Sequence, residues 1–501
     1  MGLTPAPANL WGLAWVALAP LWVLVVGGTG GRIGKVNLWL PFVWGVGYHG
    51  LAFAWIRGLH PLTWMGLSWG TSVAITGFCW VFITLWGAAL GVTWAGLFCF
   101  VLKRVPSSPL TRVLLGTALW CAVSALWNSG PLDWTSLAFT QSPHNLAILH
   151  LGQISGPTTV TGAIVAVNGL IAEAWLYRRR QNRDRRDQRF WLFASPVALF
   201  VALHLVGFGL YNQLLTESPA SALKVGIVQG NIPTRIKLFE EGTQLSLDRY
   251  TQGYQTLADQ GVDIVLTPEG ALPWLWLGRP RQSQNALYQA ILNKGVPALV
   301  GTVGMRDGKI TQTLFSITGT GAITGRYDKI KLVPLGEYIP FESFLGRFIN
   351  RLSPVGSSML PGAASQHFDT PFGRAIAAIC YDSAFPWIFR NQAAAGGQFI
   401  VTASNNDPYN ATMMSQHHAQ DVMRAIESDR WAVRATNTGF SGIVDPHGKT
   451  QWLSGFRTYE THAHTVYRRQ TQTLYVRWGD WLLPLLLVVA IVSVGMESRR
   501  T

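Results

Sequence analysis

The run Ala377-Ala378-Ile379-Cys380-Tyr381-Asp382 decides how this chain is interpreted, because it has the form of a short buried strand that ends in a cysteine. Two other strand-like runs end in candidate partners: Ile264-Val265-Leu266-Thr267-Pro268-Glu269 and Gly325-Arg326-Tyr327-Asp328-Lys329. A thiolate can attack a carbonyl, a carboxylate can take up the thiol proton, and an ammonium can stabilise the resulting oxyanion. The three residue types therefore predict nucleophilic catalysis.

Cys380 is the one cysteine outside the apolar segments, since Cys79, Cys99 and Cys121 all lie in apolar stretches. We therefore expect a free thiol rather than half of a disulfide. Simpler explanations exist, because a lone cysteine often acts as a small buried hydrophobe and a lone glutamate or lysine often serves a helix start or a surface ion pair. The ordered occurrence of the three groups at strand ends favours catalysis.

The composition indicates an integral membrane protein. Of the 501 residues, 49% are hydrophobic and 13% are charged, and 23 are tryptophans. The net charge of +14 could suggest a nucleic-acid partner, but much of the excess lies in short loops between apolar runs, above all in residues 178–189 with their seven arginines. The positive-inside rule explains this distribution better, so no nucleic acid is expected.

Apolar runs predict a membrane domain over residues 1–212 with about six transmembrane helices. The runs are Leu10–Val26, Leu38–Ile56, Gly70–Leu102, Leu110–Trp127, Thr158–Tyr177 and Phe190–Tyr211. The third run is long for one crossing, but two crossings would place its flanking positive charges on opposite faces, so we expect one long, tilted or broken element. A further transmembrane helix is expected over residues 480–496. His204 lies inside a predicted span, and we expect it to be packed or hydrogen-bonded.

The arginine-rich loop 178–189 sets the expected orientation. With this loop on the cytoplasmic side, everything after Tyr211 lies on the outer side until the last helix returns the chain. Counting back places the N-terminus outside. The opening run lacks a basic leader and a small-residue cleavage site, so it is not expected to be a secretory signal. We therefore expect a multi-pass membrane protein whose domain after Tyr211 lies on the outer face of the membrane.

Residues 223–476 have the composition of a soluble α/β domain, in which short apolar runs alternate with helical stretches. No internal sequence repeat is visible. Layered sheets with outer helices are therefore expected. The predicted strands are 224–229, 264–267, 298–304, 313–318, 375–380, 399–403 and 440–445, and two predicted helices are 245–260 and 283–294.

The ordered glutamate, lysine and cysteine resemble the triad of the nitrilase, or carbon–nitrogen hydrolase, superfamily. With membrane spans on either side, nearly the whole chain is similar to the apolipoprotein N-acyltransferase family within it. The resemblance implies a polytopic α-helical membrane domain plus an extracytoplasmic α/β domain, a nitrilase-like αββα sandwich. The runs that carry it are Val228-Gln229-Gly230-Asn231-Ile232-Pro233, Thr267-Pro268-Glu269, Tyr327-Asp328-Lys329, Leu332-Val333-Pro334-Leu335-Gly336-Glu337, Ile379-Cys380-Tyr381-Asp382, Arg424-Ala425-Ile426-Glu427 and Arg434-Ala435-Thr436-Asn437-Thr438-Gly439.

The resemblance also implies roles for single residues. Cys380 would be the nucleophile, Glu269 its general base and Lys329 the oxyanion stabiliser. Glu337 would orient the site, while Tyr381 and Asp382 would shape the pocket.

The implied reaction is a ping-pong acyl transfer. A fatty acyl chain would pass from a phospholipid to Cys380 as a thioester. It would then pass to the α-amino group of the N-terminal diacylglyceryl-cysteine of an apolipoprotein. No cofactor is implied, and a monomer is expected.

The sequence departs from the family pattern in three places. The family often has Trp after the lysine of the opening block, where this chain has Lys237-Leu238. The usual Ser-Asn-Asp-Ala-Trp-Phe-Gly run is here Asn405-Asn406-Asp407-Pro408-Tyr409-Asn410. We expect either that the family's first membrane helix is absent or that the start of the sequence is incomplete. The first two departures bear on the shape of the lipid pocket, and none touches the triad.

Two stretches are candidates for an opening toward lipid. Phe341, Phe344 and Phe348 recur at helical spacing with polar residues between them. Such a helix either packs on the domain core or lies in the outer leaflet and gates lipid entry. Trp274 and Trp276, in the apolar run 271–277, could form the other lip.

His417 and His418, with Asp421 four residues beyond the first, could suggest a metal site. We expect no metal, because no third ligand has convincing spacing and the implied chemistry needs none. Two alternative functions stay open. A membrane-tethered amidase would share the triad and hydrolyse small amides, whereas a transporter or scaffold would only bind ligand with its outer domain. Few charges lie inside the spans, which disfavours a transport pathway.

Overall fold

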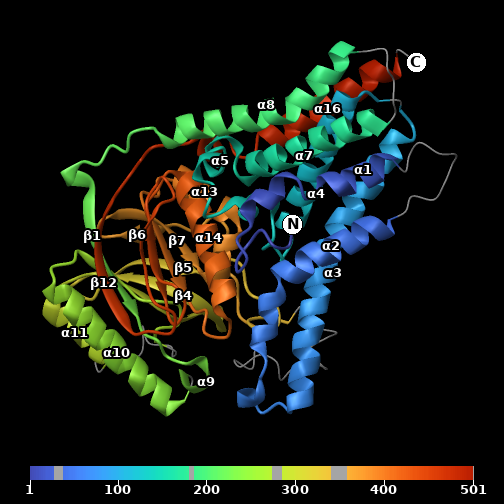
Figure 1. Cartoon of the computed structure of the whole chain (residues 1–501). Coiled ribbons are helices and arrows are strands. Elements are labelled where there is room, and N and C mark those ends of the chain that lie inside the picture. The colour runs from blue at the N-terminus through green and yellow to red at the C-terminus, as the bar shows by residue number, and fades with distance from the viewer. Residues whose placement is uncertain are drawn as a thin grey trace. The chain divides into compact units, whose positions relative to one another are not determined.

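The structure, a computed structural model, describes residues 1–27, 38–105, 107–179, 186–237, 239–272, 285–339 and 358–499. The chain divides into two compact units. The first unit consists of residues 1–60, 73–213 and 477–501, and the second of residues 61–72 and 214–476. In Figure 1 the first unit runs from blue to green and includes the red helix at the C-terminus, while the second unit runs from green to red.

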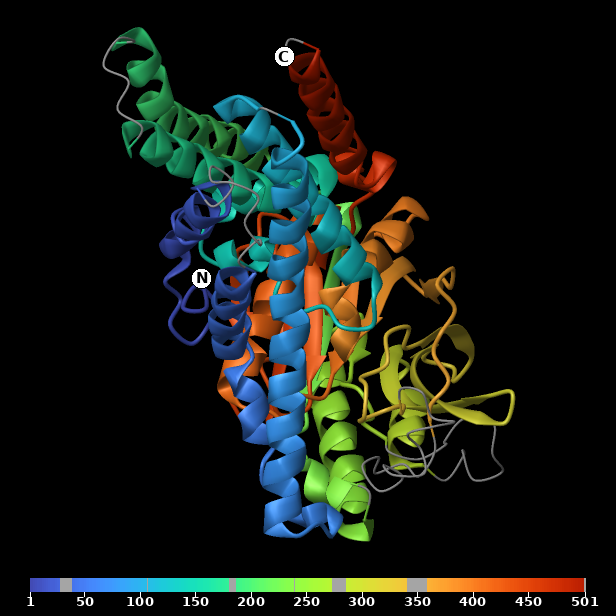
Figure 2. The same cartoon turned by 90° about the vertical axis from the view of Figure 1, so that its right-hand side faces the viewer.

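The first unit is built from apolar helices. Within the described ranges, four segments are long and apolar enough to cross a membrane, judged by length and composition: Trp69–Leu102, Pro109–Ser129, Pro157–Arg179 and Phe193–Tyr211. They are helices α3, α4, α7 and the greater part of α8 (Arg186–Tyr211). Helix α3 is continuous over 34 residues, so the prediction of one long element is confirmed (Figure 2). At 1.5 Å per residue it is about 51 Å long, well above the hydrocarbon thickness of a bilayer.

The N-terminal apolar run is not one helix. It forms η1 (Trp11–Trp15) and α1 (Ala19–Gly27), and Asn168 on α7 binds the backbone at the break. Its Oδ1 accepts from the backbone N–H groups of Leu18 and Ala19, at 2.9 and 3.0 Å, and its Nδ2 donates to Ala14 O at 2.9 Å. The side chain thus replaces backbone bonds that a continuous helix would have made. The remaining elements are α2 (Trp39–Ala52), η2 (Ala54–Leu59), η4 (Leu137–Gln141), α5 (Leu146–His150), α6 (Gly152–Ser155) and α16 (Leu482–Ser498).

His204 on α8 is hydrogen-bonded, as predicted. Its Nε2 lies 3.1 Å from Asn145 Nδ2, and its Nδ1 lies 2.8 Å from Phe200 O. The carbonyl can only accept, so Nδ1 carries the proton and Nε2 accepts from the amide.

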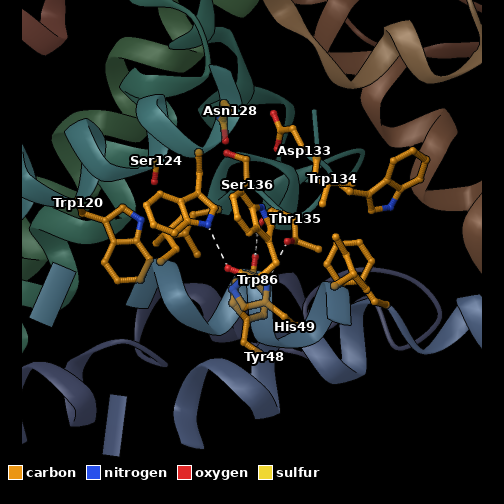
Figure 3. A pocket seen from close by; sticks show the side chains of 17 residues that line it. Tyr48, His49, Trp86, Trp120, Ser124, Asn128, Asp133, Trp134, Thr135 and Ser136 are labelled. Carbon is orange, nitrogen blue, oxygen red and sulfur yellow. Dashed lines mark hydrogen bonds between the residues drawn. The ribbon is translucent and has the colours of Figure 1, made fainter. Parts of the chain in front are cut away.

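The first unit encloses a cavity of about 40 Å³ among α2, α3, α4 and the loop 131–137 (Figure 3). Its walls are largely aromatic, and three hydrogen bonds join polar groups of the lining. Tyr48 OH donates to Thr135 O at 2.9 Å, His49 Nδ1 lies 2.9 Å from Thr135 Oγ1, and Trp127 Nε1 donates to Trp86 O at 3.0 Å. The space would hold about three water molecules.

The second unit contains two six-stranded sheets. In the first sheet the order is β12 (Glu460–Tyr467), β1 (Ala222–Gln229), β2 (Ile264–Leu266), β3 (Ala298–Arg306), β4 (Lys309–Ile317), β5 (Ile323–Asp328). In the second it is β11 (Thr450–Leu453), β10 (Gly442–Val444), β9 (Ala432–Thr436), β8 (Ile400–Ser404), β7 (Gly373–Ile379), β6 (Phe368–Thr370). Strands β1, β2 and β3 are parallel, and so are β7, β8 and β9.

The two sheets share one hydrophobic core, to which Ile227 and Leu266 contribute from one sheet and Ile379 and Val401 from the other. Helices α10 (Glu240–Asp259) and α11 (Ala286–Lys294) pack on the outer face of the first sheet. Helices α13 (Pro386–Ala394) and α14 (Ala411–Ser428) pack against strands β7, β9 and β10 of the second. This is the predicted αββα sandwich, which is confirmed.

All seven strands predicted for this domain are present, with ends shifted by up to four residues. The strand-like run before Lys329 is β5. Strands β6, β9, β11 and β12 were not predicted. The sequence of β12, Glu-Thr-His-Ala-His-Thr-Val-Tyr, is too polar to read as a buried strand, but this strand lies at a sheet edge and pairs with β1. Short elements complete the unit: η3 (Thr63–Met65), η5 (Pro219–Ser221), α9 (Thr234–Lys237), η7 (Cys380–Ala384) and α15 (Leu474–Trp478).

Candidate active site

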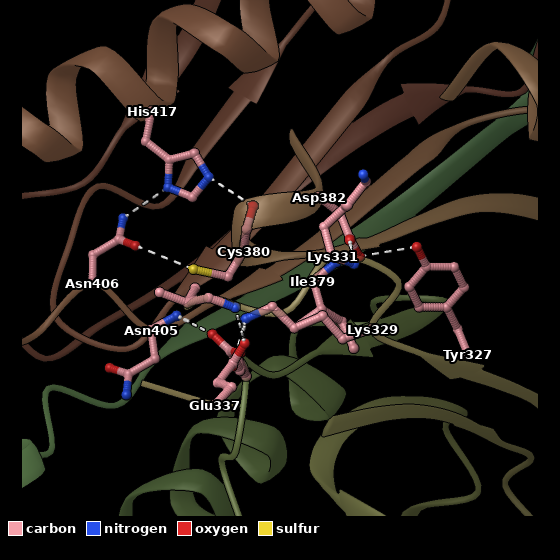
Figure 4. Close-up of polar contacts among 12 residues, drawn as sticks. Tyr327, Lys329, Lys331, Glu337, Ile379, Cys380, Asp382, Asn405, Asn406 and His417 are labelled. Atoms are coloured by element: carbon pink, nitrogen blue, oxygen red, sulfur yellow. Dashed lines mark hydrogen bonds and ion pairs between the residues drawn. The ribbon is translucent and has the colours of Figure 1, made fainter. Parts of the chain in front are cut away.

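Lys329 lies between two carboxylates at the end of β5 (Figure 4). Its Nζ is 2.9 Å from Glu269 Oε1 and 2.7 Å from Glu337 Oε1, and its side chain is 1% exposed. The second oxygen of each carboxylate accepts a backbone N–H, at 3.0 Å from Asn405 N for Glu269 and at 2.7 Å from Val333 N for Glu337. The structure therefore brings together three predicted site residues and fixes both acids from two sides.

The charges in this cluster do not balance, since one ammonium faces two acids. Burial disfavours the charge on Lys329, but the carboxylates of Glu269 and Glu337 outweigh it and hold the pKa of Lys329 well above its ordinary value. Burial raises the pKa of Glu337, against the attraction of Lys329. The surroundings thus favour the charged form of Lys329, while burial favours the protonated form of Glu337.

Cys380 follows β7 and begins the turn η7. It has a φ of +50°, a left-handed conformation that is rare and costly for a residue with a side chain. Burial raises its pKa to about 12, and the negative charge of Glu269 adds to this, with Lys329 opposing. The thiol is therefore protonated at neutral pH, so attack on a carbonyl requires that a base remove the proton during the reaction.

Asp382 joins the cysteine turn to the segment that carries the lysine. Its Oδ2 accepts from Tyr327 OH and from Ile379 N, both at 3.0 Å, and its Oδ1 accepts from Lys331 N at 2.8 Å. Burial raises its pKa to about 6. Asp382, predicted as a supporting residue, therefore joins the end of β5 to the end of β7 by hydrogen bonds. Tyr381, also predicted to shape the pocket, packs edge-on against Phe385 with ring centres 5.1 Å apart.

Four further residues at this site had no role predicted from the sequence. Asn405 binds Glu269, as described above. Cys380 Sγ donates to Asn406 Oδ1 at 3.8 Å, and His417 Nε2 lies 2.9 Å from Cys380 O. Lys237 Nζ donates to Glu269 O at 3.2 Å, and burial lowers its pKa to about 8. A usable signal existed, because Asn405 and Asn406 directly follow β8, the parallel neighbour of β7, and the carboxyl ends of such strands meet at one edge.

The histidines singled out in the sequence face different groups. His418 Nε2 lies 2.8 Å from Thr450 Oγ1, and Asp421 forms an ion pair with Arg434. Within the described ranges, no three of the ligand-type side chains His, Cys, Asp and Glu gather in a way that could hold a metal ion.

The residues proposed to gate lipid entry cannot be placed. Trp274 and Trp276 fall in 273–284, and Phe341, Phe344 and Phe348 fall in 340–357, both outside the described residues. Leu238 of the opening block is also outside them.

Comparison with known proteins decides the family. Residues 224–473 match the carbon–nitrogen hydrolase family, and residues 1–170 match the apolipoprotein N-acyltransferase N-terminal domain. An apolipoprotein N-acyltransferase of Nostoc sp. is 55% identical over 98% of this chain and 96% of its own length. The chain belongs to the apolipoprotein N-acyltransferase family. A second apolipoprotein N-acyltransferase, from Synechocystis sp., is 43% identical over 98% of both chains.

Membership of the apolipoprotein N-acyltransferase family confirms the predicted enzyme class, an acyltransferase of the membrane with a carbon–nitrogen hydrolase domain. It does not support the alternatives of a small-amide hydrolase or of a transporter or scaffold. Among solved structures, an amidase from Nesterenkonia sp. is similar to 54% of this chain and 98% of its own, with 18% identity and a TM-score of 0.40.

Proposed function

We propose that this acyltransferase moves a fatty acyl chain from a phospholipid to the α-amino group of the N-terminal diacylglyceryl-cysteine of apolipoproteins. It does so in the bacterial inner membrane, with residues 223–476 on the periplasmic face. Residues 1–212 cross the membrane about six times, and 480–496 cross once more. The observation that carries the proposal is the buried Lys329, held between two acids within electrostatic reach of the Cys380 thiol.

In the first half-reaction, Cys380 Sγ attacks the ester carbonyl of the donor. The thiol proton passes to Glu269, the carbonyl oxygen becomes an oxyanion, and the Lys329 ammonium stabilises it. The ester C–O bond then breaks, and the departing lysophospholipid alcohol takes the proton from Glu269. The product is a thioester on Cys380. Glu337 keeps Lys329 in place throughout.

In the second half-reaction, the neutral α-amine of the acceptor attacks the thioester carbonyl. Its surplus proton passes to Glu269, the C–S bond breaks, and the sulfur regains a proton. An amide forms and the enzyme returns to its starting state. Water must be kept from the thioester, which asks for a site that is closed to solvent and open to lipid. We assign this closure to the segments that contain Trp274, Trp276, Phe341, Phe344 and Phe348.

The test is mass spectrometry of the intact chain purified in detergent after exposure to phospholipid. The expected result is one fatty acyl mass on Cys380, released by hydroxylamine and discharged by a synthetic diacylglyceryl-cysteine peptide. Cys79→Ala is the matched control and should still carry the acyl group. Acylation that persists in Cys380→Ala, or a thioester that water but never the peptide discharges, would contradict the proposal.

A further inference from the structure

His417 is fully buried on α14, and its ring contacts the candidate nucleophile Cys380 with one nitrogen and Asn406 with the other (Figure 4). Its Nε2 lies 2.9 Å from Cys380 O, and its Nδ1 lies 3.2 Å from Asn406 Nδ2. Asn406, which is 1% exposed, in turn accepts from Cys380 Sγ. The three residues therefore form a closed ring of contacts around the cysteine, and nothing in the acyl-transfer steps above uses it.

The partners in this ring leave one consistent arrangement of protons. A carbonyl oxygen only accepts, so His417 Nε2 carries the hydrogen that Cys380 O receives. His417 Nδ1 is then bare and accepts from the amide nitrogen of Asn406. The amide oxygen of Asn406 consequently faces the sulfur, where it can accept from the thiol but cannot donate to a thiolate.

The surroundings keep the ring in this state. Burial holds the pKa of His417 well below its ordinary value, and the charge of Arg434 adds to the effect, so the imidazole is neutral. Gly439 packs on Asn406, where a Cβ would lie 3.0 Å from the amide nitrogen. The neighbouring histidine, His418, points to Thr450 instead.

We propose that His417 is a positioning residue that acts on Cys380 through Asn406 and through the Cys380 carbonyl. Its Nε2–H holds the left-handed turn of Cys380, and its Nδ1 locks the Asn406 amide with the oxygen toward sulfur. The hydrogen bond from the thiol to Asn406 keeps Cys380 protonated and oriented until a donor carbonyl binds next to Cys380 and Glu269 can accept the proton. The inference rests on the proposed role of Cys380 as the nucleophile.

The test measures how fast iodoacetamide alkylates Cys380 in the full chain at pH 8, by peptide mass spectrometry. Asn406→Ala removes the acceptor of the S–H and should speed alkylation about fivefold, the factor that one ordinary hydrogen bond represents. Asn406→Asp places a negative charge beside sulfur and should slow it. If one substitution at Asn406 speeds alkylation and the other slows it, looser packing around Cys380 is excluded as the cause, because looser packing would speed alkylation in both variants.

The same measurement tests whether His417 acts through Asn406. His417→Ala frees the amide to turn its nitrogen toward sulfur, so alkylation should speed up about as much as in Asn406→Ala, and the double variant should show no further gain. His417→Gln keeps a donor for Cys380 O and should recover acyl transfer relative to His417→Ala. His418→Ala, a buried histidine on the same helix, is the matched control and should change alkylation less than about twofold.

Three outcomes would each overturn the proposal. They are alkylation rates that change in the same direction in both Asn406 variants, additive changes in the double variant, and a change in His418→Ala as large as that in His417→Ala. Because alkylation needs no lipid, this outcome is separate from that of the proposed function. A chain that shows the alkylation pattern but never forms an acyl-cysteine would refute the transfer reaction and leave the positioning role standing.

Discussion

Two buried ion clusters in this protein each join a basic side chain to glutamate, and they differ in the number of acids that the cation faces. In the first unit, Arg112 on α4 pairs with Glu173 on α7, whose side chain is 0% exposed. Arg112 Nε donates to Glu173 Oε1 at 2.8 Å, Arg112 Nη2 bonds the other oxygen, and Trp22 Nε1 also donates to Oε1 at 3.2 Å. In the second unit, one ammonium of Lys329 serves the carboxylates of Glu269 and Glu337.

The difference distinguishes a cluster that stabilises the fold from one that takes part in the reaction. A bidentate one-to-one pair neutralises itself, so its main effect is to join two helices, and breaking it leaves a costly unpaired charge. The cluster around Lys329 has two acids for one ammonium and lies beside a thiol that must lose a proton. In the uneven cluster, burial raises the pKa of Glu337.

The largest effect should come from the thiol itself. Cys380→Ser replaces a good thioester-forming nucleophile with a hydroxyl of much higher pKa, so acyl transfer should fall by about 10³-fold or more. Folding should be nearly unchanged, because the two side chains have similar size. Transfer to a diacylglyceryl-cysteine peptide, measured with the thermal unfolding temperature, checks both points. If the serine variant kept acyl-transfer activity within tenfold of wild type, Cys380 would not be the nucleophile.

Neutralising the cation of each cluster tests the contrast directly. Lys329→Met removes the oxyanion partner and should lower transfer by about 10²- to 10³-fold in the folded protein. Arg112→Met should instead cost about 3–5 kcal/mol of stability while each folded molecule keeps most of its activity. Activity per folded molecule, with the folded fraction taken from gel filtration, distinguishes the two. Equal loss of specific activity in both variants would break the distinction between the clusters.

Glu337→Gln converts the uneven cluster into a balanced pair of Lys329 and Glu269. The charge of Glu337 is one of the causes that raise the pKa of Cys380, so its removal should lower that pKa and speed alkylation at pH 8. Acyl transfer should nevertheless fall, by about 10-fold to 10²-fold, because Lys329 loses an orienting partner. Slower alkylation in this variant would show that the charge of Glu337 does not govern the thiol.

The smallest effect concerns Asp382. Because burial raises its pKa to about 6, the folded chain binds more protons than the unfolded chain between about pH 4 and 6. Stability should therefore decline as pH rises through this window, by at most about 3 kcal/mol for this group. The unfolding temperature at pH 5 and pH 7 should differ less in Asp382→Asn than in wild type. An identical difference in both would show that this carboxyl is not the titrating group.

Much of the catalytic site was predictable because its main members sit at strand ends. Glu269, Lys329 and Cys380 follow strand-like runs that were recognisable in the sequence and that form β2, β5 and β7. His417 was visible only as part of a weak metal motif, since its partners are a backbone carbonyl and an amide distant in sequence. Arg434 is buried in β9 through its pairing with Asp421, so a charged residue hid that strand.

The order of residues along the chain was enough to predict the class of this protein: apolar runs of membrane length, an α/β domain, and the residues of a nucleophilic site. These features depend on composition and local periodicity, which are properties of neighbouring residues along the chain. The packing of distant segments was needed to learn that the Lys329 ammonium binds two acids, that the Cys380 turn is left-handed, and that His417 and Asn406 contact Cys380. Those facts depend on distances between strands and helices far apart in sequence, which no local pattern encodes.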